Sequence, residues 1–374
     1  MSGYIGIGGK AKKIKGIYLG VGGVAKSVKK AYVGIGGKAK LWYVSGPPIS
    51  YNSTISKGVS ANRYSYTGRV GNYLYVGSRT SNSRYAYDTS LTKKTWETTD
   101  SVYGIVTMSS YILVGVRSSP NSLDAYNSSL TKSTVNLGPG IYISTIGSNM
   151  TYALLRKATT SGYFITVNNS LSVNTNNISI GVNPVSGYGM SSCYLNGRAI
   201  FGGGASSSDG ETTIDNVLTV DTSLAVTQLS VILGSIDYEN MCSASSKYAM
   251  FLCGGNPATV YNTSFTRSSV SSPENQAWNG NSTVVGGGEY LLIYPWLTAG
   301  TSAYDTWGRT IGYVDSKLTK VQLDNMSGVR RNSDMWGGCN RNGGAIANYI
   351  ILTGGYTTSS STANSSDYIY QINY

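Results

Sequence analysis

Short runs of alternating apolar and polar residues recur along the chain, and no stretch shows the apolar period of an amphipathic helix. After residue 50 these runs group in fours. The first two groups are residues 63–70, 73–77, 84–87 and 93–98, followed by 103–108, 111–116, 122–126 and 132–137. The pattern predicts an all-β chain built from repeated four-stranded units.

One short phrase recurs six times among these runs: an apolar or aromatic residue, Asp or Asn, two further residues that are almost always small and polar, then Leu or Phe. The copies are residues 87–91, 126–130, 167–171, 220–224, 261–265 and 314–318. The spacings between their Asp/Asn residues are 39, 41, 53, 41 and 53 residues. A period in this range predicts a propeller or a solenoid.

The phrase has the residues of a tight turn, because an Asp or Asn side chain can bond the backbone two residues further on. We expect the apolar residues on either side of the turn to lie on the two strands that it joins. Each copy is therefore predicted to connect the third and fourth strands of one propeller blade.

The number of blades follows from the second strands. Besides those in the first two groups, they are predicted at 152–155, 199–202, 248–252, 290–293 and 349–352, which makes seven. The chain ends in a third strand at 368–374, and residues 52–60 match the stretch that follows each phrase. A strand at residues 52–60 would be the fourth strand of the last blade and would leave no open edge. We predict a seven-bladed propeller over 51–374, with six blades as the alternative.

A different repeat of 14 residues occupies the beginning of the chain, with units that start at Tyr4, Tyr18 and Tyr32. Each unit has a β-rich stretch, a Gly-Gly pair and alternating lysine and apolar residues, which predicts one β-hairpin per unit. Residues 1–45 are thus predicted to be a hairpin repeat domain, followed by a proline linker at 46–50.

The net charge of +12 belongs to this first segment. Residues 1–45 contain nine lysines and no acidic residue, whereas the rest has 20 basic and 17 acidic residues, a net charge of +3. The lysines could neutralise nucleic-acid phosphates or protect strand edges from unwanted pairing. The absence of arginine and the regular hairpins favour docking to a partner over nucleic acid. The docking candidates are Lys10, Lys12, Lys26, Lys38 and Lys40.

The chain has no histidine, which removes the commonest general base and metal ligand and any Ser-His-Asp triad. Its four cysteines lack metal-ligand spacing and are predicted to be buried thiols of a reducing cytoplasm rather than disulfides. We expect no metal and no cofactor. No run approaches the ~18 apolar residues of a membrane span, so no membrane insertion is expected. Lysines interrupt any signal-peptide core, so we expect release by lysis or inside a particle.

The predicted blades resemble kelch-type propellers. Gly-Gly ends the second strand at Gly202-Gly203, Gly254-Gly255 and Gly354-Gly355, and a Tyr-Asp-like pair ends the third. The tryptophan expected in the fourth strand is present only at Trp96. Copper oxidases of this architecture require histidine ligands, so that activity is excluded.

The three leading units resemble glycine- and lysine-rich repeats at the start of bacteriophage and prophage tail and baseplate proteins. This resemblance implies that the N-terminal part joins a particle beside other tail proteins and that the C-terminal domain faces outward. It also implies a virion location, assembly in the host cytoplasm, and several copies per particle or a homo-oligomer.

Three long loops between second and third strands are the candidate binding face, because long unstructured loops are often functional. They span 202–213, 295–308 and 355–367. Exposed aromatic residues beside a carboxylate suit sugar stacking and protein contact, although the tryptophans could instead pin their own loop. The candidate ligand-binding residues are Trp296, Tyr304, Asp305, Trp307 and Tyr356.

Three functions remain open on this basis. The first is a non-enzymatic tail fibre or baseplate protein that binds a bacterial surface glycan or protein. The second is a glycosidase or lyase that acts on host polysaccharide, for which Asp209 and Glu211 could pair as acid and base. The same two residues could bind Ca²⁺ or form a solvated turn. The third is a purely structural virion scaffold.

Overall fold

The structure is a computed structural model of the chain. It describes residues 4–7, 10–13, 17–21, 24–28, 30–35, 38–44, 47–56, 65–78, 83–97, 101–116, 119, 121–138, 143–157, 162–181, 190–203, 214–230, 241–252, 257–271, 283–294, 311–323, 343–353 and 366–373. These residues form strands and turns without a helix. The chain divides into two compact units, Met1–Ser53 with Tyr370–Tyr374, and Thr54–Ile369.

Three separate two-stranded antiparallel sheets form at the beginning of the chain, one in each 14-residue unit. They are β1 (Tyr4–Ile7) with β2 (Lys10–Lys13), β3 (Tyr18–Val21) with β4 (Val24–Ser27), and β5 (Lys30–Ile35) with β6 (Lys38–Val44). In the first hairpin Ile7 pairs with Lys10, so two residues connect the strands. The predicted hairpins with two-residue connections are therefore present.

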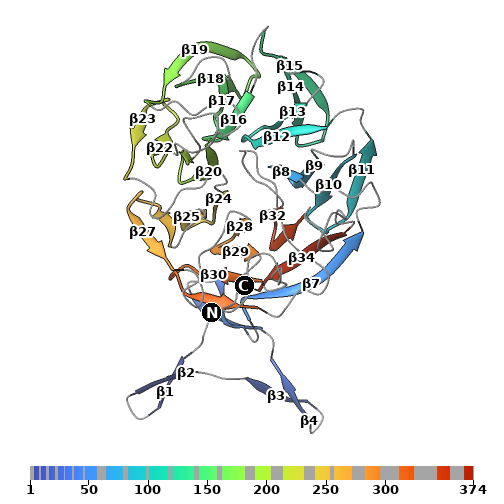
Figure 1. Ribbon diagram of the computed structural model, residues 1–374. Helices are drawn as coiled ribbons and strands as arrows, with labels where there is room; N and C mark the ends of the chain where they lie inside the picture. The colour runs from blue at the N-terminus through green and yellow to red at the C-terminus, as the bar shows by residue number, and fades with distance from the viewer. Residues whose placement is uncertain are drawn as a thin grey trace, which may run out of the picture. The chain divides into compact units, whose positions relative to one another are not determined.

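Seven four-stranded antiparallel sheets follow, arranged as the blades of a propeller (Figure 1). In the first six, sequence order is also spatial order, and the innermost strand comes first. Blades one to three are β8 (Ser65–Val70), β9 (Tyr73–Ser78), β10 (Ser83–Asp88), β11 (Lys93–Glu97); β12 (Val102–Thr107), β13 (Tyr111–Val116), β14 (Ser122–Asn127), β15 (Lys132–Asn136); β16 (Ile143–Ser148), β17 (Tyr152–Lys157), β18 (Tyr163–Asn168), β19 (Val173–Ser179).

The remaining blades repeat this arrangement. Blades four to six are β20 (Ser191–Leu195), β21 (Arg198–Gly202), β22 (Val217–Val220), β23 (Val226–Gln228); β24 (Met241–Ala244), β25 (Tyr248–Leu252), β26 (Ala258–Asn262), β27 (Arg267–Val270); β28 (Thr283–Gly287), β29 (Tyr290–Tyr294), β30 (Gly312–Val314), β31 (Lys320–Gln322). The seventh contains β32 (Gly343–Ile346), β33 (Tyr349–Leu352), β34 (Ser366–Ile372) and β7 (Ile49–Ser56). The predicted all-β, seven-bladed fold is confirmed.

The seventh sheet has the order β32-β33-β34-β7, so a strand from before the first blade completes the last one. Where β34 ends and β7 begins, the backbone N–H of Asn373 donates to the carbonyl of Pro48 at 2.7 Å. The Asn373 side chain donates to the carbonyl of Pro47 at 2.9 Å and to Ser50 Oγ at 3.0 Å. Closure removes the open edges that a row of blades would otherwise expose.

The six phrases form one kind of turn between the third and fourth strands. In blade two the N–H groups of Ser129 and Thr131 donate to Asn127 Oδ1 at 2.9 and 3.0 Å. The N–H of Leu130 donates to the carbonyl of Asn127 at 2.9 Å. The other five copies repeat these three bonds. The predicted bond from the Asp/Asn side chain to the backbone two residues on is therefore present.

One part of the turn prediction is wrong. The Leu or Phe of each phrase does not lie on the fourth strand but occupies the turn with a positive φ, 60° at Leu130. The left-handed conformation costs a residue with a side chain about 1–2 kcal/mol, which is why glycine usually takes this position. All six side chains are partly buried against an apolar cluster, and this packing offsets the cost. They are Leu91, Leu130, Leu171, Leu224, Phe265 and Leu318.

Apolar clusters between neighbouring blades form the core of the propeller. One combines Val106 and Leu113 of blade two with Leu155 and Ile165 of blade three. Another joins blades seven and one through residues such as Ile351 and Tyr85. Because each described cluster draws on two blades, no blade buries its apolar faces alone, and the closed ring is the unit that stabilises all of them.

Candidate functional site

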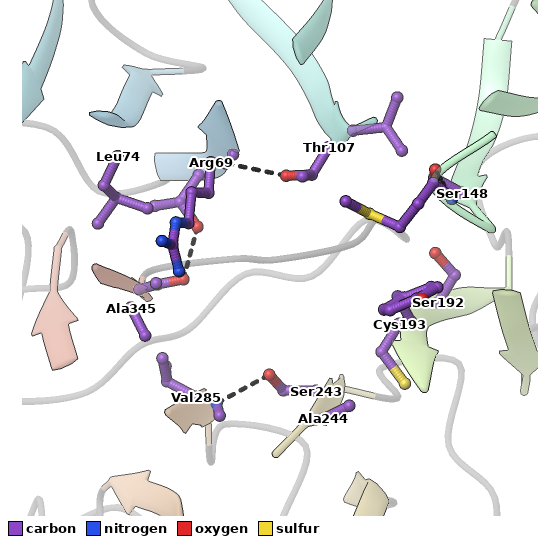
Figure 2. Close-up of a pocket in the computed structure, with 18 residues that line it drawn as sticks. Arg69, Leu74, Thr107, Ser148, Ser192, Cys193, Ser243, Ala244, Val285 and Ala345 are labelled. Atoms are coloured by element: carbon purple, nitrogen blue, oxygen red, sulfur yellow. Dashed lines mark hydrogen bonds between the residues drawn. The ribbon is translucent and has the colours of Figure 1, made fainter. Parts of the chain in front are cut away.

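A cavity of about 320 Å³ lies where the innermost strands of the seven blades meet. Its lining includes residues from β8, β12, β16, β20, β24, β28 and β32, the first strands of their blades. Figure 2 shows Arg69, Thr107 and Ser148 along one side of this space and Ala244, Val285 and Ala345 along the other. The cavity is the central channel of the propeller.

Seven equivalent residues, one from each first strand, surround the channel at a single level. Each pairs with the second residue of the second strand in its blade, which places all seven one step from the turn between those strands. We call this set the mouth ring. It consists of Arg69, Thr107, Ser148, Tyr194, Ala244, Gly286 and Ala345.

The mouth ring has two chemically different halves. Blades one to four contribute a guanidinium and three hydroxyl groups, those of Thr107, Ser148 and Tyr194. Blades five to seven contribute two alanines and a glycine, whose side chains are too small to fill the channel. Arg69 is exposed, and Tyr194 is 42 % exposed. The channel is thus open beside a polar wall.

Three hydroxyl groups in the channel each accept one hydrogen bond from the backbone. Thr107 Oγ1 accepts the N–H of Arg69 at 2.9 Å, and Ser148 Oγ accepts the N–H of Met150 at 2.8 Å. Ser243 Oγ, one residue deeper, accepts the N–H of Gly286 at 2.9 Å. Within the described part of the chain, no acceptor receives the hydroxyl hydrogens of these three residues. Their O–H groups can therefore donate to a ligand.

Among the described residues that line the cavity, Arg69 is the one with a charged side chain. Its Nε lies 3.5 Å from the carbonyl oxygen of Gly71, a weak contact at best. The ion pairs of the described residues involve Arg84, Lys132, Arg198 and Lys247 instead. The channel therefore contains a cation whose charge no described carboxylate neutralises.

Gly286 brings blades five and six together beside the channel. A Cβ atom at this position would lie 1.8 Å from the carbonyl oxygen of Ala244. Only glycine permits this approach of one innermost strand to the next. Gly286 of the small half is thus fixed by backbone packing.

Two cysteines meet on the wall of the channel. Cys193 of β20 and Cys242 of β24 are buried thiols, as predicted, and their sulfur atoms lie 2.7 Å apart without a disulfide. Cys193 also lines the cavity. The two residues are 49 positions apart, so no local spacing of cysteines indicated the pair.

Buried tyrosines surround a buried carboxylate where the first and seventh blades meet. Tyr87 Oη donates to Asp367 Oδ2 at 2.8 Å, and both residues have no exposed surface. Burial, with a further contribution from the nearby charge of Asp367, raises the pKa of Tyr85 and Tyr87 well above the usual value of 10.0. Tyr85 and Tyr87 belong to the apolar cluster between these blades, so we assign them a structural role.

The structure leaves most of the sequence-predicted site residues untested. Trp296, Tyr304, Asp305, Trp307 and Tyr356 lie outside the described residues, as do Asp209 and Glu211.

The docking candidates lie on hairpin strands: Lys10 and Lys12 on β2, Lys26 on β4, and Lys38 and Lys40 on β6. Their strand positions agree with the predicted hairpins, and their role in docking stays a prediction. The described residues contain no group of three His, Cys, Asp or Glu side chains that could hold a metal ion. No helix in this part of the chain is long and apolar enough to span a membrane.

Comparison with known proteins identifies the architecture. No family model matches the chain, and no curated protein matches its sequence. Among solved structures it is similar to selenomethionine-substituted virginiamycin B lyase from Staphylococcus aureus, with 10% identity and a TM-score of 0.55 over 86% of this chain and 99% of that chain. A catalytically inactive histidine-to-alanine variant of that lyase with quinupristin gives 9% identity, a TM-score of 0.55 and the same coverage.

A further similar structure is PorZ, a bacterial surface component of the type-IX secretion system of Porphyromonas gingivalis. It has 11% identity and a TM-score of 0.47 over 83% of this chain and 39% of that chain. At these identities the likeness to the lyase shows the β-propeller fold and nothing finer. Membership of a kelch or tail-protein family stays a prediction.

The mouth ring was missed by sequence reasoning, which considered only loops as binding surfaces. A signal was present, because each ring residue lies at a fixed distance before the first residue of a second strand. Alignment of the seven first strands would have shown Arg69 at a position where blades five to seven have Ala or Gly. The direction of the side chains toward a common channel follows only from the closed ring.

Proposed function

We propose that the chain is a structural and binding protein of a bacteriophage or phage-like tail. The N-terminal hairpins dock it to neighbouring tail or baseplate proteins, and the propeller binds a glycan or protein of the bacterial surface. Three consecutive lysine-bearing hairpins ahead of a closed propeller support the particle role. In this combination the hairpins serve for attachment, and the propeller has a cavity of its own.

The observation that carries the binding role is the cavity in the propeller. Its polar wall has an unneutralised guanidinium and hydroxyl hydrogens that no described residue accepts, and such groups favour a bound ligand. A propeller that served only as a scaffold would gain nothing from them. These features favour binding over the purely structural alternative.

An enzymatic role, as a glycosidase or lyase on surface polysaccharide, is the second candidate because virginiamycin B lyase shares the fold. A histidine-to-alanine variant of that lyase is catalytically inactive, whereas this chain contains no histidine. Catalysis here would have to use carboxylates. Release of new reducing ends from purified host polysaccharide by the full chain would establish this role in place of simple binding.

The particle role is tested by labelling the full chain in particles released by lysis of the cells that produce it. Antibody label at one position on a tail is expected, and particles without label would overturn this role. A variant with glutamine at Lys10, Lys12, Lys26, Lys38 and Lys40 should lose incorporation. A matched variant with glutamine at exposed Lys94 and Lys317 of the propeller should retain it.

The binding role is tested separately, by exposing the full chain to a glycan array and to purified bacterial envelopes. Binding to at least one envelope is expected. Failure to bind any host envelope would leave the structural scaffold as the remaining function.

A further inference from the structure

We propose that the mouth ring binds the carboxylate of an acidic sugar residue. The claim rests on the proposed binding function and adds to it the chemical class of the ligand. Such a residue would be the terminal sugar of a surface glycan, recognised by the ring donors of blades one to four together with Ser243 of blade five. The argument has three parts: charge, hydrogen bonding and size.

Charge favours an anion. Arg69 is exposed in the channel, and no described carboxylate lies against its guanidinium. Arginine is always protonated and presents a planar set of donors that matches a carboxylate in a bidentate manner. A neutral sugar would leave the guanidinium without a counter-charge.

Hydrogen bonding favours a ligand rich in acceptors. Thr107 and Ser148 stand next to Arg69 in successive blades, and each already accepts a backbone N–H. Ser243 of blade five accepts one backbone N–H in the same way. Each of these hydroxyls still has its O–H hydrogen to donate to a ligand. A carboxylate accepts several such bonds, and sugar oxygens accept the others.

Size favours a single ring. The cavity of about 320 Å³ is near the lower end of the range of roughly 300–1,000 Å³ for small-molecule sites. Ala244, Gly286 and Ala345 leave the half opposite the donors free of long side chains. A sugar ring can lie against this half while its carboxylate meets Arg69. The aromatic ring of Tyr194, 42 % exposed, offers a further contact at the edge.

Titration calorimetry of the full chain with D-glucuronate and D-glucose tests this inference, because the two sugars differ only at C6, which is a carboxylate in glucuronate and a hydroxymethyl group in glucose. Glucuronate is expected to bind about tenfold or more tightly than glucose. Arg69→Gln should weaken glucuronate binding by about ten- to hundredfold, as for a lost bond to a charged group, and leave glucose unchanged. Ser148→Ala should weaken it by about two- to tenfold. Lys94→Gln, which removes an exposed lysine of β11, should have no effect.

The outcomes separate this inference from the function on which it rests. Equal binding of both sugars, or an unchanged affinity in Arg69→Gln, overturns the carboxylate site but keeps a sugar-binding propeller. Acetate that binds as tightly as glucuronate overturns the sugar part and leaves a simple anion site. If neither sugar binds while the chain still binds host envelopes, the inference fails and the proposed function stands. Loss of both kinds of binding overturns both.

Discussion

The carboxylate of Asp124 forms an ion pair with an arginine that lies between the first two blades. Arg84 of β10 is 2 % exposed, and its Nη1 lies 3.0 Å from Asp124 Oδ2 of β14. The same nitrogen donates to Tyr126 Oη at 3.0 Å, and Lys132 Nζ lies 2.8 Å from Asp124 Oδ1. Burial alone would lower the pKa of Arg84. The phenol of Tyr75 and the bond to Asp124 oppose this and raise it overall.

We expect Asp124→Asn to destabilise the propeller by about 3–5 kcal/mol, because it leaves the Arg84 charge buried without a counter-ion. The Coulomb attraction between Arg84 and Asp124 at 3.0 Å is about 5–6 kcal/mol with an effective dielectric constant near 20. The expected loss of stability is therefore most of this attraction. The pair with Lys132 adds little, since that side chain is 53% exposed. The loss is a large fraction of the roughly 5–15 kcal/mol that stabilises a folded domain.

Urea unfolding, followed by circular dichroism, measures these differences in the free energy of unfolding. Lys132→Met is the control and should cost less than about 1 kcal/mol. The double variant Arg84→Met with Asp124→Leu removes both charges and should be far more stable than Asp124→Asn, close to the native chain. A loss below about 1 kcal/mol in Asp124→Asn, or a double variant as unstable as the sum of its single changes, would refute the reasoning.

Three further predictions concern other buried groups. Because the folded pKa values of Tyr85 and Tyr87 are raised above 10.0, the stability they contribute is complete below pH 10 and falls as the pH rises further. Tyrosinate absorbance should show groups that ionise only on unfolding, and full ionisation of the folded chain near pH 10 would contradict this. Hydrogen peroxide should oxidise Cys193 and Cys242 to a disulfide, with two thiols and one peroxide giving one disulfide and two waters. Intact mass should show the loss of two hydrogens, which Cys242→Ser should prevent, and two thiols that remain alkylatable after peroxide would contradict the pairing. Gly286→Ala should destabilise the propeller by about 1–3 kcal/mol or more in urea unfolding, since the new Cβ meets a backbone carbonyl, and an unchanged midpoint would show that the strands can separate.

The fold could be predicted from the sequence because one local structure recurs in it. Each Asp or Asn of the phrase organises its turn through bonds to residues two and four positions away, so the signal is contained in five residues. The closing strand was predictable for the same reason, since residues 52–60 resemble the stretch that follows each phrase. Observed strand ends differ from the predicted ones by only one or two residues in the first two blades.

The left-handed Leu130 and the pair of Cys193 and Cys242 were not predictable in the same way. Leucine rarely adopts a positive φ, and here its side chain packs against a cluster to which both its own blade and the neighbouring blade contribute. The cysteines meet because two innermost strands lie side by side at the channel. Both features depend on contacts between blades, which a pattern within one blade does not contain.

The difference between the phrase and the mouth ring separates architecture from function. The phrase keeps the same bonds in six blades, because every blade needs the same turn to join its third and fourth strands. The mouth ring has the same backbone position in seven blades, yet its residues range from glycine to arginine. At six of these positions the side chain ranges from alanine to arginine, so the blade itself does not dictate it. Gly286 is the exception, because the packing of blade five against blade six requires glycine there. The arginine and hydroxyl groups of the polar half have no such packing reason, and this is why the proposed ligand is sought beside Arg69.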